Sequence, residues 1–191
     1  IGTDLAAAGI DLDLAPVVDV SSDPDNPVIG VRAFGTEPSV VAEHARAYVE
    51  GLREARILSC AKHFPGHGDT RVDSHVGLPR VDVGLDTLRE RDLVPFAATV
   101  AAGVDAVMTA HIVFPALEER PATLSPPVLR LLRGTGAQLA VWLSDDPVLF
   151  EHSYGPVIDL YDLVMHCGDA RVLRFHEERA GRPTGVNIPF W

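Results

Sequence analysis

The chain has 191 residues, enough for one large domain or two small ones, and its 47% of hydrophobic residues can fill a buried core. Its formal net charge of −11 argues against nucleic acid as a partner, because phosphate backbones are bound by clustered lysine and arginine. No apolar run approaches the roughly 20 residues of a membrane span, so no span is expected.

The first half of the chain alternates apolar runs of strand length with segments of helical period. A strand followed by a loop is predicted within residues 10–20, where Pro16 ends regular pairing. Residues 39–55 are predicted to form an amphipathic helix, because apolar side chains recur there at spacings of three and four. Residues 57–63 should form the next strand.

The pattern continues with residues 85–103, which predict a helix that is bent or restarted at Pro95 and stops at Gly103. A strand is then expected over residues 106–114, and a helix begins at the serine cap Ser125. The remaining predicted elements are strands at residues 137–144 and 162–168 and a helix at residues 169–181.

This alternation predicts an α/β fold in which helices cover a parallel sheet. An open doubly wound sheet often carries a GxGxxG turn, and no strand end in this sequence has one. A (β/α)8 barrel instead gathers reactive residues on the loops that follow several strands. Such residues follow the predicted strands here: Asp19, Lys62 with His63, His111, and Asp145 with Asp146. The barrel is therefore the favoured fold.

The segment AKHFPGHGDTRVDSH, residues 61–75, concentrates three histidines, two aspartates and a lysine. KHFPGHG followed by Asp-Ser-His resembles the signature of glycoside hydrolase family 3, and within it the bacterial β-N-acetylglucosaminidase branch. The segments GIDLDLAPVVDV, VIGVRAFG and AVMTAHIVFPALEERPATLS agree with that family in the same order. The resemblance covers about residues 1–132, and it reaches residue 146 if the later SDD segment is included.

The resemblance implies retaining hydrolysis of a terminal β-linked N-acetylglucosamine or related β-hexose through a glycosyl-enzyme intermediate. By motif position, His75 is the general acid/base and Asp73 orients it. An imidazole that titrates near neutrality can both donate and accept a proton, and a neighbouring carboxylate can stabilise the imidazolium. The substrate would be bound by Arg32, Lys62 and His63.

The nucleophile implied by the resemblance is Asp145 in VWLSDDP, with Asp146 as the second candidate. His67 and Asp69 are expected to shape the loop, whereas His111 is left open between lining the pocket and making a structural hydrogen bond. The spacing of the motif histidines does not fit a compact helical pair of zinc ligands, and glycosyl transfer of this kind needs no ion. We therefore expect no metal and no cofactor.

A full barrel of this class takes roughly 250 residues and eight strands. Because about six strands are recognisable, we predict a partial barrel over residues 1–150 that lacks its first strands, followed by a divergent strand–helix segment at residues 151–191. The missing strands, one of which would carry a sugar-binding aspartate in the family, should lie upstream of Ile1. An open barrel exposes strand edges, and these could support self-association.

The compartment stays open from the sequence, with the cytoplasm favoured. Cys60 and Cys167 each lie in an apolar run and are expected to be reduced, buried thiols. No secretory signal is visible, but the chain begins within an expected helix, which leaves a missing leader, secretion or a lipid anchor open.

Three hypotheses for the function follow. The leading one is a glycosidase that acts on an oligosaccharide or a muropeptide. The second is a catalytically inactive truncated or chimeric barrel that binds sugar. The third is a glycosyltransferase-like C-terminal half, because residues 151–191 do not resemble family 3 and bear a limited similarity to a strand–helix half of nucleotide-sugar glycosyltransferases.

Overall fold

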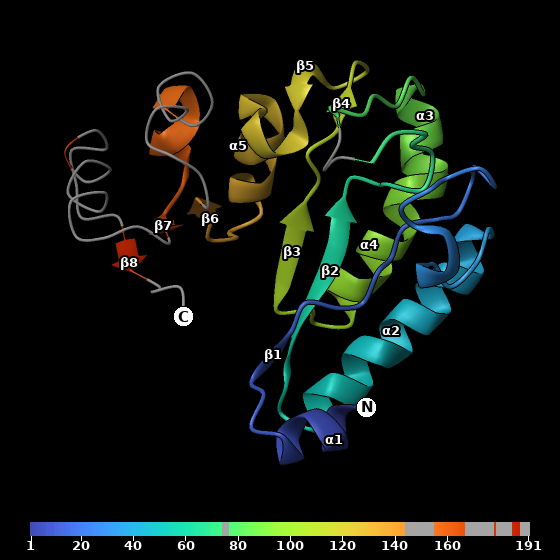
Figure 1. Ribbon diagram of the computed structural model, residues 1–191, viewed down its shortest axis with the longest axis vertical. Coiled ribbons are helices and arrows are strands. Elements are labelled where there is room, and N and C mark those ends of the chain that lie inside the picture. The colour runs from blue at the N-terminus through green and yellow to red at the C-terminus, as the bar shows by residue number, and fades with distance from the viewer. Residues whose placement is uncertain (74–76, 144–154, 167–177, 179–184, 188–191) are drawn as a thin grey trace. The chain divides into compact units, whose positions relative to one another are not determined.

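The computed structural model describes residues 1–73, 77–143, 155–166, 178 and 185–187 (Figure 1). The chain divides into two compact units, residues 1–123 and residues 124–191, and each contains a small parallel sheet. Among the described residues, no helix combines the length and the apolar character that crossing a membrane requires.

The first unit contains three parallel strands in the order β1-β2-β3: β1 (Leu12–Asp13), β2 (Leu58–Phe64) and β3 (Ala106–Thr109). β2 lies in the middle, within one residue at each end of the predicted strand. Beyond β1, an isolated bridge between Val17 and Lys62 carries the parallel pairing on toward the carboxyl end of β2. Proteins with parallel α/β sheets bind ligands at the carboxyl ends of the strands, and Lys62 lies near such an end.

Helices α2 (Pro38–Glu54) and α4 (Leu93–Ala101) pack against each other, and both contact β2 (Figure 1). A shorter helix, α1 (Gly2–Ala7), precedes β1 and contacts α2. The face that α2 buries consists of apolar side chains with the predicted spacing: Val41, Ala42, Ala45, Val49 and Leu52. The amphipathic helix predicted at residues 39–55 is therefore confirmed.

The helix predicted at residues 85–103 is interrupted. It consists of α3 (Leu85–Thr87), a π-helical turn at Leu88–Asp92, and α4. The interruption falls ahead of Pro95, which lies in the first turn of α4, where an N–H has no α-helical partner to lose. The break is thus earlier than predicted, whereas Gly103 follows the helix with a φ of 82°, as a terminating glycine should.

The strand predicted at residues 106–114 is split in two. After β3 the chain turns, and β4 (Val113–Phe114) pairs antiparallel with β5 (Glu118–Pro121). The turn is held by the N–H of Ala110, which donates to the carbonyl of Phe64 at 2.7 Å. His111 lies in this turn and is exposed. The apolar residues around it bury themselves in a cluster with the chain that leads to α4: Val81, Leu88, Ala110, Ile112 and Phe114.

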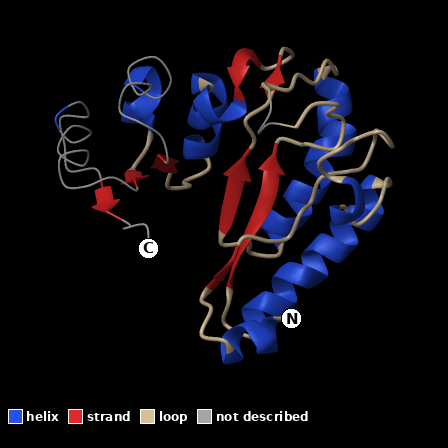
Figure 2. Cartoon of the chain, viewed as in Figure 1, coloured by secondary structure: helices blue, strands red, loops and turns tan. Residues whose placement is uncertain are grey.

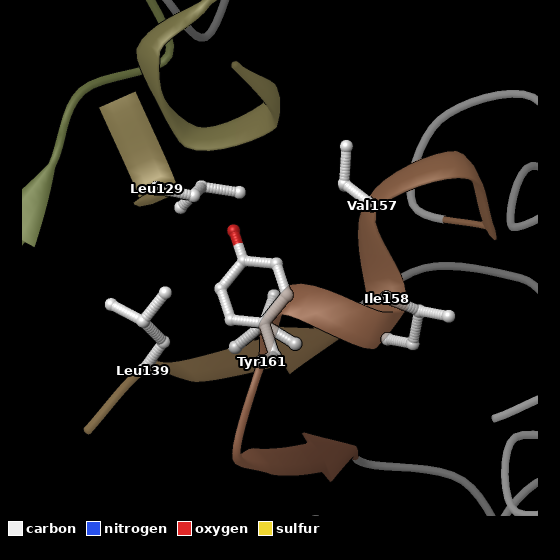
Figure 3. Packing of buried hydrophobic residues seen from close by; sticks show 6 residues of the cluster. Leu129, Leu139, Val157, Ile158 and Tyr161 are labelled. Carbon is white, nitrogen blue, oxygen red and sulfur yellow. The ribbon is translucent and has the colours of Figure 1, made fainter. Parts of the chain in front are cut away.

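The second unit has a parallel sheet of its own, in the order β6-β7-β8. Its helix and strands are α5 (Pro126–Gly134), β6 (Ala140–Leu143), β7 (Leu163–His166) and β8 (Gly185–Asn187). The hydroxyl of Ser125 accepts from the N–H of Val128 at 3.3 Å, which confirms the predicted cap of α5. Figure 3 shows the apolar cluster that α5 shares with the sheet and a 3-10 helix at Gly155–Leu160; its buried members are Leu129, Leu139, Val141, Val157, Ile158 and Tyr161.

Helices and strands alternate through both units, so the predicted α/β class is confirmed (Figure 2). The expected barrel, the division at residue 150 and self-association stay predictions. Of the two cysteines, Cys60 is buried and free, and burial raises the pKa of its thiol. Cys167 and most of the helix predicted at residues 169–181 lie outside the described residues.

Candidate active site

Lys62 and His63 occupy the carboxyl end of β2, just before Phe64. Their backbone is held by the neighbouring segment, because the N–H of Val18 donates to the carbonyl of Lys62 at 2.8 Å. The Lys62–His63 peptide bond is cis. Both residues keep part of their surface exposed, so they combine a fixed backbone with side chains that solvent reaches.

Asp19 lies behind this strand end, and its carboxylate is completely buried. One of its oxygens, Oδ2, is 2.7 Å from Nδ1 of His63. The other, Oδ1, accepts from the backbone N–H of His63 at 3.2 Å and from that of His67 at 2.7 Å. A charged group without water needs such partners to be tolerated in a protein interior. The sequence placed Asp19 after a strand but did not assign it a role.

His67 is buried inside the motif loop, where only 3% of its surface is exposed. Its Nδ1 lies 2.6 Å from the hydroxyl oxygen of Thr70, and that hydroxyl donates to the carbonyl of His67 at 3.0 Å. Because the hydroxyl proton is used in this way, the Thr70 oxygen accepts from Nδ1–H of the histidine. The side-chain amide of Asn26 also donates to the His67 carbonyl, at 2.7 Å. His67 thus has the loop-shaping role that the sequence suggested.

The ionisation of His67 is shifted by the same surroundings. Burial lowers the pKa of His67, against the opposing effect of the Asp19 carboxylate. His63 and the charge of Arg32 lower it further. His67 is therefore favoured as a neutral ring in the folded chain.

Asp69, the other motif residue expected to shape the loop, binds Arg91 of the π-helical turn. The Nη2 atom of Arg91 lies 3.1 Å from the Asp69 carboxylate and 3.0 Å from the carboxylate of Asp92. Asp92 is buried, and burial raises its pKa although Arg91 acts in the opposite direction. This pair of contacts ties the loop to the turn that precedes α4.

One more ion pair holds the loop two residues before Asp73. Arg71 binds the carboxylate of Asp23 at 2.7 Å, and the pKa of Asp23 is lowered, first by the N–H of Asp25 and then by Arg71. Asp73 is partly exposed, and its carbonyl accepts from the N–H of Gly77 at 3.0 Å. His75, the predicted acid/base, lies outside the described residues.

Arg32 is the last residue of a 3-10 helix at Gly30–Arg32 and is exposed. Its Nη1 donates to the carbonyl of Val28 at 3.4 Å, and its charge acts on His67. The first unit thus brings Lys62 and His63 together with the loop that leads to Asp73, and the charge of Arg32 acts on this loop at His67. Asp145 and Asp146 lie outside the described residues, so the roles of nucleophile and acid/base stay predictions.

Two further features bear on the site. A cavity of about 300 Å³ is lined by α1 and α2, through residues such as Thr3 and Tyr48, and none of the candidate residues lines it. Within the part of the chain that the structure describes, no three His, Cys, Asp or Glu side chains are arranged to hold a metal ion.

Comparison with known proteins gives a consistent picture. The N-terminal domain of glycosyl hydrolase family 3 matches this chain over residues 1–147. A β-hexosaminidase of Xylella fastidiosa is 47% identical over 148 residues, which cover 76% of this chain and 43% of that protein. A β-hexosaminidase of Stenotrophomonas maltophilia is 41% identical over 180 residues, which cover 93% of this chain and 53% of the relative. The chain therefore spans about half the length of these relatives.

The same similarity holds in three dimensions. The structure of NagZ from Neisseria gonorrhoeae in complex with N-trifluoroacetyl-D-glucosamine superimposes with a TM-score of 0.74 at 36% identity. The superposition covers 97% of this chain and 55% of NagZ. Together with the 180-residue alignment, this likeness extends past residue 150, where the sequence alone had suggested no resemblance.

The close approach of the motif loop to the chain after Val18 can be tested at Gly68. A Cβ atom on Gly68 would overlap the carbonyl oxygen of Val20. We expect Gly68→Ala to lower the free energy of unfolding by about 3 kcal/mol or more, because backbone would have to move. The matched control is Gly51→Ala in α2, where an added Cβ meets nothing within 4 Å. That change should stabilise the helix by about 0.5–1 kcal/mol in urea unfolding. Equal effects of the two substitutions on the free energy of unfolding would contradict the close approach of Gly68 to the Val20 carbonyl.

The lowered pKa of His67 predicts a loss of stability in acid. As the pH falls below the unfolded pKa of about 6.5, the unfolded chain takes up a proton before the folded chain does. The stability is therefore complete above that pH and is lost as the pH falls through the lowered folded pKa, by at most about 1.4 kcal/mol per pH unit. The difference in unfolding free energy between wild type and His67→Gln should shrink over this range. A difference that stays constant over this range would refute the assignment.

Proposed function

The chain belongs to glycosyl hydrolase family 3, and from this membership we propose that it carries the site of a retaining β-N-acetylglucosaminidase. The substrate is a terminal β-linked N-acetylglucosamine, or a related β-hexose, on an oligosaccharide or a muropeptide. The names of its β-hexosaminidase relatives and the N-acylated glucosamine bound to NagZ support this choice of sugar.

The observation that carries the proposal is the strand end of β2 together with its anchored loop. Lys62 and His63 stand at the carboxyl end of a central parallel strand, where barrel enzymes bind substrate. The loop that follows is tied down at His67, Asp69 and Arg71 before it reaches Asp73. A loop with a fixed base can bring a catalytic side chain to the same place in every turnover, which orientation-dependent catalysis requires.

In the proposed reaction, the Asp145 carboxylate attacks the anomeric carbon while His75 protonates the departing glycosidic oxygen. The product is a glycosyl ester of Asp145 and a free alcohol. His75 then removes a proton from water, whose oxygen attacks the anomeric carbon and regenerates the carboxylate. Asp73 orients His75 throughout, as an aspartate does for the histidine of a serine-protease triad.

The substrate-binding roles go to Arg32, Lys62 and His63, whose donors and acceptors match sugar hydroxyls. The reaction as proposed uses no cofactor and no metal. For the fold, we propose a partial (β/α)8 barrel over residues 1–150, followed by the segment at residues 151–191. The glycosyltransferase alternative for that segment is not favoured, because the alignment with the Stenotrophomonas maltophilia β-hexosaminidase covers 93% of the chain.

The acid/base role of His75 predicts a dependence on the leaving group. With 4-nitrophenyl β-N-acetylglucosaminide, His75→Ala should lower kcat/KM by about 100- to 10,000-fold relative to the wild-type chain. The loss should be smaller with a 2,4-dinitrophenyl glycoside, because that leaving group departs without a proton. His44→Ala, an exposed histidine of α2, is the control and should keep full activity. Rates that are equal in wild type and His75→Ala and no higher than the uncatalysed rate would remove the enzymatic proposal in favour of a sugar-binding module.

The nucleophile can be identified by trapping. A fluorinated β-N-acetylglucosaminide that forms the glycosyl-enzyme quickly and hydrolyses slowly should label the wild-type chain with one sugar, found on the Asp145 peptide by mass spectrometry. Asp145→Asn should abolish the label, whereas the neighbouring Asp146→Asn should keep it. A label on another carboxylate would transfer the role to that residue.

A further inference from the structure

The hydrogen bonds of Asp19 define one proton on His63. The carboxylate is fully buried, and its Oδ2 faces Nδ1 of His63 at 2.7 Å. Its Oδ1 is occupied by the N–H groups of His63 and His67. An ionised carboxylate only accepts hydrogen bonds, so the ring nitrogen facing it must carry a hydrogen. The opposite tautomer would set a nitrogen lone pair against a carboxylate oxygen.

We propose that Asp19 is a positioning residue that keeps the proton of His63 on Nδ1, which leaves Nε2 as the nitrogen that accepts from a substrate hydroxyl. The substrate half of this inference rests on the proposed function, whereas the tautomer half is a property of the chain by itself. Neither the sequence nor the family match assigns this role to Asp19.

The surroundings of the His63 ring restrict it further. Its centroid lies 5.4 Å from that of His67 at an interplanar angle of 77°, an edge-to-face contact between the two rings. The same carboxylate also accepts, through Oδ1, from the backbone N–H groups of both histidines, which fixes their backbone next to the His63 ring. The side chain of His63 is 16% exposed, which leaves a small part of it accessible to a ligand.

The fixed tautomer has a consequence for recognition. Lys62 is a donor only, and Nε2 of neutral His63 is an acceptor only, so adjacent residues of β2 present opposite hydrogen-bonding character. Sugar hydroxyls can donate and accept, and this pair would accept from one hydroxyl and donate to another. If the proton moved to Nε2, the neutral ring would offer a second donor, and a hydroxyl proton would lose its acceptor.

The isosteric change Asp19→Asn tests the tautomer directly. An asparagine can keep its oxygen toward the backbone N–H groups of His63 and His67 and then turns its NH2 toward Nδ1. The ring must accept at Nδ1, so its proton moves to Nε2. With ¹⁵N-labelled histidine, long-range ¹H–¹⁵N correlation spectra of the full chain at a pH where His63 is neutral should show a protonated Nδ1 in wild type and a protonated Nε2 in Asp19→Asn. His63→Gln identifies the resonance by its disappearance.

Kinetics test whether the tautomer matters to the substrate. On the chromogenic glycoside, Asp19→Asn should lower kcat/KM by about 10- to 100-fold, the range expected when a polar contact to substrate is lost and its partner left unpaired. In the His63→Gln background, Asp19→Asn should have little further effect, because Asp19 acts through His63. Asp105→Asn is the matched control. It removes a carboxylate that also holds β2, through Ser59 at 2.9 Å, and it should leave kcat/KM unchanged.

The outcomes separate this inference from the proposed function. A wild-type spectrum in which Nδ1 of His63 carries no proton overturns the inference. This measurement does not depend on the folding of any variant. An unchanged tautomer in a folded Asp19→Asn chain overturns it as well, as does an equal loss of kcat/KM from Asp19→Asn with and without His63. The wild-type chain could show a proton on Nδ1 of His63 and yet fail to hydrolyse the glycoside. In that case the positioning of His63 stands and the proposed function falls.

Discussion

A carboxylate shut away from water has to be surrounded by donors, and this requirement at Asp19 organises the candidate site. The donors come from two parts of one motif: the ring and backbone of His63 at the end of β2, and the backbone of His67 in the loop. The backbone N–H groups of both histidines donate to Oδ1, and the ring of His63 meets Oδ2, so one carboxylate links the end of β2 to the loop. The entry of the loop into the site is therefore set by a buried charge, and apolar packing of β2 against α2 and α4 holds the strand in place behind it.

Beyond Asp19, the loop is fixed by polar contacts to two other segments, one around residues 23–26 and one at Arg91. Asn26 binds the carbonyl of His67, Arg91 binds Asp69, and Arg71 binds Asp23. Ion pairs on the surface contribute little to stability, but Asp23 is largely buried and Arg91 is mostly covered. Such contacts select one conformation of the loop more than they add to the stability of the fold. These contacts hold the loop at several points ahead of Asp73, the residue that is proposed to orient the acid/base.

The elements that the sequence predicted well are those that local physics defines. The buried face of α2, the cap at Ser125 and the strand at Leu58–Phe64 each follow from patterns within a few residues. Long-range contacts lie at both places where the prediction differed: the π-helical turn ahead of Pro95 carries the ion pair of Arg91 with Asp69, and residues 106–114 are split where Ala110 bonds another strand. The bond from Ala110 to the carbonyl of Phe64 is one of these, and no local pattern encodes it.

The candidate site divides in the same way. The sequence by itself determined the family, the motif and the place of Lys62 and His63 at a strand end, because the order of residues along the chain carries that information. Only the tertiary structure decided that Asp19 belongs with His63, that Asn26 and Thr70 hold His67, and that Arg91 reaches Asp69. Asp19 and His63 are 44 positions apart, and Asn26 and His67 are 41 apart. Contacts across such distances arise when strands pair and helices pack, so they exist in the fold and have no counterpart in the local sequence.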